Sequence, residues 1–577
     1  MKIGSMKKTN KWETESSAID KEDIEHILFT NEVIDSFLCY ENNYFIIANK
    51  GLGKTLMLQY KRLLLEKEYK GSAKFIPNDN PYLDNMDSIG NLDKQKINLF
   101  SNIEECKSIW SLSLELSILS FHTNNMTSKE LKELLKISNI LEITLENILS
   151  TNILLHLLSM TYSQLKKFTN TYRSQINSLF RQTIKSKTFI FIDRLDQALY
   201  DNKHFYEKEV FRKLWINFQA GLMLGAWEVM QKNNHVKIYT SIRHEALANT
   251  TDYSQDKSAI SSSTTQVKYS NKELYKMLNQ LSYKYENKET FEAFIGFDKI
   301  DNVYHNKEED IFNYIRRHTL GRPRDFVRIC HGLSLLDEIT IERYRTHVNN
   351  ESSDIVESYF SEQSPFLKIL DNKEERNVFL SLLNSNILNA DELTTSCDSF
   401  NRNGCDKNCK NCNYSHPFCE LYNIGLLGIL EEDAINGKYI QTFLRPSEIR
   451  INIDKSLPKS RLYIVHPALE QIITRAKNDL NFDKPYKIVR NFIVGHKLEW
   501  NEDDIKKIEA SKVMQELNIT DVDDIEKLIY EHINSKKDDT QTGTFQDFIV
   551  KVQEKMLTKT TNEVASQAIE ALKQIFM

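Results

Sequence analysis

The feature that most constrains the fold of this chain is a short apolar segment, residues 44–47, that leads through a glycine-containing loop into a helical pattern. Gly51 and Gly53 allow backbone N–H groups to turn toward an anion, and Lys54 and Thr55 open the predicted helix. A strand, a glycine loop, Lys-Thr and a helix in this order are the parts of a phosphate-binding loop. The feature therefore predicts an α/β domain with a parallel sheet that binds a nucleotide.

Within this loop, Lys54 is expected to reach the β- and γ-phosphates of ATP, and Thr55 is expected to bind Mg²⁺. The loop departs from the pattern G-x-x-x-x-G-K-[ST] at one position, where Ala48 replaces the first glycine. The alternative is an ordinary glycine turn before a helix. The residues expected to contact ATP are Asn49, Lys50, Gly51, Leu52, Gly53, Lys54, Thr55 and Leu56.

Length and composition predict several domains. A chain of 577 residues has room for about three or four domains, and only 16 Gly and 9 Pro favour a helix-rich architecture. No apolar run reaches the length of about 18 residues that a membrane span needs, so we expect a cytoplasmic protein without membrane contact. The expected parts are a flexible tail (1–22), a P-loop core (23–250) with a helical insertion at about 128–185, a helical lid (251–350), a winged-helix-like module (351–475) and a helical C-terminal region (476–577).

A second apolar segment, residues 188–192, ends in Asp193. A fully apolar run is typical of a central parallel strand, and a carboxylate at its C-terminal end can hold Mg²⁺ opposite a phosphate loop. We expect this role for Asp193. Asp196 is a candidate for orienting the attacking water or for supporting the site.

Two later segments are expected to reach the same site. Residues 235–245 predict another strand, in which Ser241 would contact the γ-phosphate or the attacking water. Arg243 is a candidate either for contact with a neighbouring subunit or for pairing with a surface acid at the end of the strand. Farther on, Arg322 and Arg324 flank a helix start at a Gly-Arg-Pro-Arg turn, where a guanidinium can hold phosphate oxygens. The alternative there is a helix–helix turn with solvated arginines.

Taken in order, these segments resemble the AAA+ and STAND-like bacterial P-loop ATPases, including their KAP-type and origin-recognition-type relatives. The resemblance covers residues from about 22 to 345. It implies a five-stranded parallel core, a helical lid, ATP with Mg²⁺, and self-association near the nucleotide. The matching positions are Lys54 and Thr55 for Walker A, Asp193 and Asp196 for Walker B, Ser241 for sensor 1, and Arg324, with Arg322 as substitute, for the lid arginine.

The resemblance also implies a function. Many AAA+ ATPases have a catalytic glutamate where this chain has Arg194, so hydrolysis is expected to be slow or to use Asp196. We expect an ATPase switch that couples its nucleotide state to homo-oligomerisation and to a separate effector or partner protein, an arrangement that in this family is associated with defence against phages. The alternatives are a DNA-binding initiator or transposition-type regulator, and a scaffold that holds ATP without hydrolysing it.

A cysteine-rich segment spans residues 397–419. Soft ligands in short loops at these separations suit tetrahedral Zn²⁺. An iron–sulfur cluster and unligated thiols are the alternatives. The expected zinc ligands are Cys405, Cys409, Cys412 and Cys419, with Cys397 or His416 as substitutes.

The cysteine segment lies within the region predicted to be winged-helix-like, because helices there precede two strands, the second at residues 439–444. A winged helix usually binds DNA, but residues 421–444 contain few basic side chains, so protein contact rivals nucleic-acid contact. Apolar stripes in residues 480–577 predict helices that dock a partner or pack on the rest of the chain.

Overall fold

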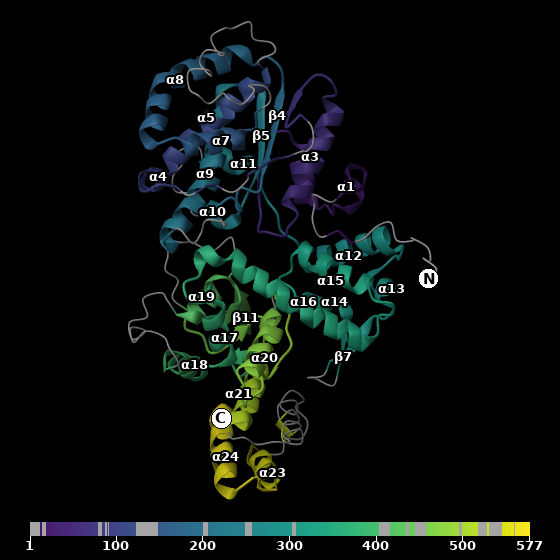
Figure 1. Cartoon of the computed structure of the whole chain (residues 1–577). Coiled ribbons are helices and arrows are strands. Elements are labelled where there is room, and N and C mark those ends of the chain that lie inside the picture. Colours follow the sequence, from purple (N-terminus) through teal and green to yellow (C-terminus); the bar gives the residue numbers. More distant parts are fainter. Residues whose placement is uncertain are drawn as a thin grey trace, which may run out of the picture. The chain divides into compact units, whose positions relative to one another are not determined.

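The computed structural model divides the chain into two compact units, coloured along the sequence in Figure 1. Unit 1 comprises Met1–Ile300, Glu309–Arg376 and Leu444–Ser456, and unit 2 comprises Asp301–Glu308, Asn377–Phe443 and Leu457–Met577. The structure describes residues 12–13, 19–78, 83–86, 89–90, 92–122, 148–199, 206–248, 257–302, 307–402, 416–433, 438–444, 457–494, 499–516, 525, 528–529, 545–558 and 560–576. No helix in these ranges is both long and apolar enough to cross a membrane.

Unit 1 is an α/β domain built on a six-stranded sheet in which every pairing is parallel. The strand order is β2-β4-β5-β1-β6, and β3 pairs with β4 on the β2 side. The resemblance implied five strands; the sixth, β3, lies in a polar stretch without a strand pattern. The strands are β1 (Phe45–Ile47), β2 (Lys74–Ile76), β3 (Asp84–Asn85), β4 (Thr188–Asp193), β5 (Val236–Ile242) and β6 (Thr264–Gln266).

Helices cover both faces of this sheet. In Figure 1, α1 and α3 lie on one side of β4 and β5, and α5, α7 and α9 lie on the other. Burial on both faces explains why β4 is buried along its whole length and why its four central residues, 189–192, are apolar. The helices are α1 (Lys21–Ile27), α2 (Glu32–Cys39), α3 (Lys54–Glu68), α4 (Lys94–Phe100), α5 (Ile103–His122), α7 (Ser150–Ser159), α8 (Tyr162–Thr183), α9 (Lys208–Lys232), α10 (His244–Ala248) and α11 (Lys257–Ser262).

The helical insertion expected at 128–185 is present as α7 and α8 in its second half; residues 123–147 lie outside the described ranges. Both helices pack beside α5, which also packs along α9. Gly221 of α9 allows this close approach, because a Cβ atom there would lie 2.6 Å from the Cβ of Cys106. The insertion is therefore part of the layer that covers one face of the sheet.

The predicted lid forms a second hydrophobic core within unit 1. Trp12, from the segment expected to be a flexible tail, is 1% exposed in this core. α16 continues past residue 350, where the sequence suggested a domain boundary. The lid elements are α12 (Asn271–Glu286), α13 (Phe291–Ile295), α14 (Ile311–Arg317), α15 (Pro323–Ser334) and α16 (Ile341–Glu362), followed by a 3₁₀ helix, Ser364–Phe366. The paired strands β7 (Lys299–Asn302) and β8 (Lys307–Asp310) lie between α13 and α14 in the sequence, and part of each belongs to unit 2.

Unit 2 contains a five-stranded sheet with the order β13-β11-β10-β12-β9, in which all pairings are antiparallel. Its last helices, α21, α23 and α24, contribute to one hydrophobic core. The strands are β9 (Ile387–Leu388), β10 (Leu427–Asp433), β11 (Lys438–Phe443), β12 (Tyr463–Val465) and β13 (Glu499–Trp500). The helices are α17 (Lys373–Ser381), whose first residues belong to unit 1, and α18 (Ala390–Arg402), α19 (Pro417–Asn423), α20 (Glu470–Asp479), α21 (Glu502–Glu516), α23 (Phe545–Leu557) and α24 (Asn562–Phe576).

Candidate functional site

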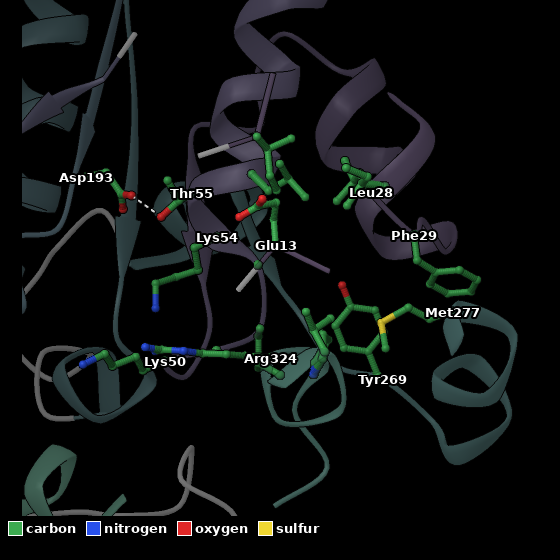
Figure 2. A pocket seen from close by; sticks show the side chains of 18 of the residues that line it. Glu13, Leu28, Phe29, Lys50, Lys54, Thr55, Asp193, Tyr269, Met277 and Arg324 are labelled. Carbon is green, nitrogen blue, oxygen red and sulfur yellow. Dashed lines mark hydrogen bonds between the residues drawn. The ribbon is translucent and has the colours of Figure 1, made fainter. Parts of the chain in front are cut away.

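The candidate site lies in unit 1, where the carboxyl ends of β1, β4 and β5 meet the start of α3 (Figure 2). Gly51 and Gly53 have φ angles of +88° and +87°, which residues with a Cβ atom rarely adopt. Gly53 directly precedes α3. The loop therefore leads the chain to a helix N-terminus, whose N–H groups and dipole attract an anion.

Lys54 and Thr55, the first residues of α3, make different contacts. The Lys54 Nζ donates to the carbonyl oxygens of Ala48 and Asn49, each at 3.1 Å, so its ammonium group lies against the loop itself. Burial lowers the pKa of Lys54, and the nearby Asp196 offsets part of this effect. The Thr55 hydroxyl donates instead to the Asp193 carboxylate at 2.5 Å, the contact drawn as a dashed line in Figure 2.

Asp193 joins residues from three segments. Its side chain is buried, with Oδ2 accepting from Thr55 and Oδ1 accepting from the Ser241 hydroxyl. These contacts are possible because β4 pairs with β5, and β5 pairs with the strand that delivers the phosphate loop. Thr55, Asp193 and Ser241, which the sequence assigned to one site, therefore lie together.

Asp196 and Arg243 form an ion pair in which the arginine is buried and the carboxylate is partly buried. Arg243 is 1% exposed and contacts Asp196 Oδ2 at 3.3 Å and Glu245 Oε1 at 2.7 Å. Burial alone would raise the pKa of Glu245, but the Arg243 guanidinium lowers it to about 2. Arg243 therefore pairs with acids of its own chain, but the pairing expected from the sequence was with a surface acid, whereas Arg243 and Glu245 are buried.

The two arginines of the 321–324 turn differ sharply. Arg322 is buried and forms ion pairs with Asp325 at 2.8 Å and Glu362 at 2.7 Å. Burial lowers the pKa of Arg322, but Asp325 and Glu362 more than reverse this effect, so its pKa is raised. Arg324, the preferred lid arginine, lines the cavity beside the phosphate loop, and its backbone N–H donates to the Gly51 carbonyl at 3.2 Å.

A cavity of about 410 Å³ extends from the phosphate loop toward the lid. Figure 2 shows Lys50, Lys54 and Asp193 toward one end of it and Leu28, Phe29 and Met277 toward the other. The sequence did not assign the apolar end to the site, because its residues follow core-like helical patterns. That end is lined by Ile19, Ile27, Leu28, Phe29, Tyr269, Met277, Leu281 and Val327, and Glu13 also lines the cavity.

Two buried amide oxygens near the loop accept no hydrogen bond within the described residues. One is Asn49 Oδ1, in the loop, and the other is Asn85 Oδ1, on β3 opposite Asp193. Buried polar atoms usually have partners, so orphaned acceptors beside a glycine loop fit a site that binds a polar ligand or hydrated cation. Asn85 could have been found only from the strand pairing, because its neighbours in sequence give no motif.

Three of the expected zinc ligands, Cys405, Cys409 and Cys412, lie outside the described ranges. Cys419 lies on α19, and the substitutes lie close together: Cys397 Sγ, on α18, is 3.8 Å from Nδ1 of His416. Among the described residues no group of three or more metal-ligating side chains occurs. The described part therefore brings Cys397 and His416 of the expected ligand set close together.

Comparisons with protein-family models and with curated proteins find no match to this chain.

Proposed function

We propose that unit 1 binds ATP with Mg²⁺. The observation that carries the proposal is the Thr55–Asp193 hydrogen bond beside a loop with two left-handed glycines and Lys54. Lys54 would contact the terminal phosphates, and Thr55 and Asp193 would hold the cation directly or through water. Mg²⁺ would supply positive charge that stabilises the phosphoryl oxygens.

The cavity favours a nucleotide over phosphate alone as the ligand, because its charged end continues into an apolar end. Aromatic and aliphatic side chains there, including Phe29 and Met277, suit the faces of a nucleobase. Arg324 lines the same cavity and would reach the phosphates from the lid. We therefore assign the base to the pocket between the N-terminal segment and the lid.

Hydrolysis is proposed to be slow. Arg194, directly after Asp193, lines the cavity with a φ of +61° and offers no carboxylate. Asp196 is the alternative base, but its carboxylate is held by Arg243 in this structure. Ser241 would orient a water or the γ-phosphate, although its hydroxyl donates to Asp193 in this structure.

We further propose that the nucleotide state controls homo-oligomerisation and a separate effector or partner protein, as the resemblance to AAA+ and STAND-like ATPases suggests, with phage defence as the setting. A winged-helix role for unit 2 and a Zn²⁺ site at 397–419 belong to the same proposal. The Cys397–His416 pair supports the metal, because thiol and imidazole are the ligands that Zn²⁺ prefers.

The test compares wild type with Lys54→Ala and, as a matched control, with Lys67→Ala, an exposed lysine on the same helix. ATP binding in the presence of Mg²⁺ is measured by calorimetry, and phosphate release is assayed on the same samples. We expect Lys54→Ala to weaken ATP binding by at least about tenfold, since it removes a charge-assisted contact, and Lys67→Ala to bind like wild type.

Equal binding by all three proteins, or by none, would refute the nucleotide site. Binding that depends on Lys54 but occurs without phosphate release would favour the second candidate, a scaffold that holds ATP. The observation behind that candidate is Arg194 in place of a carboxylate.

A further inference from the structure

The last residue of α16, Glu362, reaches the phosphate loop from a helix that belongs to no predicted motif. Its side chain is 8% exposed. Oε2 lies 2.7 Å from a guanidinium nitrogen of Arg322, and Oε1 lies 3.8 Å from Nζ of Lys50. The same Arg322 nitrogen is 3.5 Å from the carbonyl oxygen of Lys50. One carboxylate thus contacts a loop lysine and a lid arginine together.

The cations around Glu362 keep it ionised. Burial alone would raise the pKa of Glu362, but Arg322, Arg243, Lys50 and Arg324 together lower it. Lys50 and Arg324 also line the cavity beside the phosphate loop. Glu362 therefore lies in the same positive potential that a polyphosphate would use.

The next residue, Gln363, is linked to Asp196 through Glu245 and Arg243. Its amide nitrogen donates to Glu245 Oε1 at 3.2 Å, and Glu245 in turn pairs with Arg243, the partner of Asp196. The chain then enters the 3₁₀ helix Ser364–Phe366, where Phe366 meets Trp215 of α9 edge to face. Two consecutive residues at the end of α16 thus contact both the phosphate loop and the Asp196 network.

We propose that Glu362 is a built-in anionic ligand of the phosphate-site cations, and that the phosphates of a bound nucleotide displace it and loosen the end of α16. The inference rests on the nucleotide binding proposed above. Lys50 is the cation for which the two anions compete, because it both contacts Glu362 and lines the cavity. When the phosphate site is occupied, the end of α16 loosens, and this change is passed to the residues that follow it in the chain.

Thermodynamic linkage determines whether removing the charge of Glu362 strengthens or weakens phosphate binding. If phosphate binding weakens the Glu362 contacts, removing the charge of Glu362 must strengthen phosphate binding by the same factor. The gain must also grow with the number of phosphates, because it arises from like-charge repulsion. A carboxylate that merely holds the loop in its binding shape would give the opposite result, a loss of affinity on substitution.

The experiment compares wild type, Glu362→Gln and Glu351→Gln, with Lys54→Ala as the test of nucleotide binding. Glu351 is the control because it lies on the same helix and pairs with an arginine, Arg328, outside the cavity lining. Dissociation constants are measured for ATP, ADP and adenosine. We expect Glu362→Gln to bind ATP about five- to tenfold more tightly than wild type, ADP with a smaller gain and adenosine with none, while Glu351→Gln matches wild type.

Unchanged or weaker ATP binding by Glu362→Gln would overturn the inference. If that variant does not fold, hydrogen exchange of the wild-type segment 359–369 decides, since ATP but not adenosine should accelerate it; unchanged or slower exchange contradicts the inference. A wild type that binds no ATP refutes the nucleotide site and this inference with it, whereas Lys54-dependent binding without a Glu362 effect refutes the inference alone.

Discussion

Arg322 and Arg324 are two positions apart, yet one serves the fold and the other faces the cavity. Pro323 starts α15, so Arg322 precedes the helix and turns inward to Asp325 and Glu362, whereas Arg324 lies in its first turn on the cavity wall. From the sequence, Arg324 was expected to be the lid arginine, with Arg322 as its substitute. Their surroundings predict different effects when each is removed.

Arg322→Ala is expected to lower the free energy of unfolding by about 3–5 kcal/mol, because it removes the guanidinium that pairs with two buried carboxylates, Asp325 and Glu362. Arg324→Ala should change it by less than about 1 kcal/mol while weakening ATP binding by about tenfold. Chemical denaturation and ATP titration of both variants check the contrast. Equal stability losses would show that Arg324 is also structural.

Asp84 provides a test by pH. Burial raises the pKa of Asp84 to about 6 from its ordinary 3.8, against the effect of its hydrogen bonds with Thr151. A raised pKa means that the stabilisation by the protonated form is present below the ordinary value and is lost as the pH rises through the folded value. Asp84→Asn, which stays neutral, should therefore gain about 1 kcal/mol relative to wild type between about pH 5 and about pH 7.5.

The measurement for Asp84 is urea denaturation at both pH values. Asp298→Asn serves as the control, because Asp298 is exposed. A relative stability of Asp84→Asn that stays constant with pH, or falls, would contradict a buried ionisable carboxylate at this position.

At this scale short local patterns were enough to place the glycine loop, Asp193 and Ser241 at one site, and the structure brings these residues together. It could not indicate Glu362, Gln363 or Asn85, whose importance comes only from contacts with segments far away in the chain. It also could not decide whether Arg243 faces a partner or its own chain, because that depends on burial.

At the scale of elements, the contact between α5 and α9 depends on glycine. Gly221→Ala would place a Cβ atom 2.6 Å from Cys106 Cβ and 2.8 Å from the Cys106 carbonyl carbon, so the helix backbones must separate. We expect a loss of about 1–3 kcal/mol in the free energy of unfolding, measured by thermal denaturation. Gly90→Ala is the control: Gly90 is exposed, and an added Cβ atom there would have no neighbour within 4 Å, so the free energy of unfolding should hardly change.

The sequence predicted elements well where periodicity was strong. The apolar segments at 44–47, 188–192 and 235–242 form β1, β4 and β5, and the parallel α/β sheet of unit 1 follows from them. It failed at β3, whose two polar residues pair with β4 only because the preceding chain returns to that edge of the sheet. It also placed a domain boundary at residue 350, within α16, where Ser352 and Ser353 are buried and the helix continues to Glu362.

At the scale of the whole molecule, two units with separate cores predict two thermal transitions. Saturating ATP with Mg²⁺, at about 100 times its dissociation constant, should stabilise the transition of unit 1 by about 2.7 kcal/mol. A zinc chelator should lower only the other transition, because the cysteine segment belongs to unit 2. Differential scanning calorimetry measures both effects.

Controls separate the two effects. Lys54→Ala should abolish the ATP shift, and Cys405→Ser should reproduce the chelator shift, while substitution of the exposed Cys39 in unit 1 should do neither. A chelator without effect, together with metal analysis showing no zinc, would remove the metal from the proposal.

The strand order also determines when the site can assemble during synthesis. In the sheet, β1 lies between β5 and β6, so its hydrogen-bonding neighbours are made only after residues 236 and 264. At 5–20 residues per second, the nascent chain carries β1 for on the order of ten seconds before either neighbour exists. The strand that leads into the phosphate loop must therefore wait for partners that are made much later, and its apolar side chains stay unburied in the meantime.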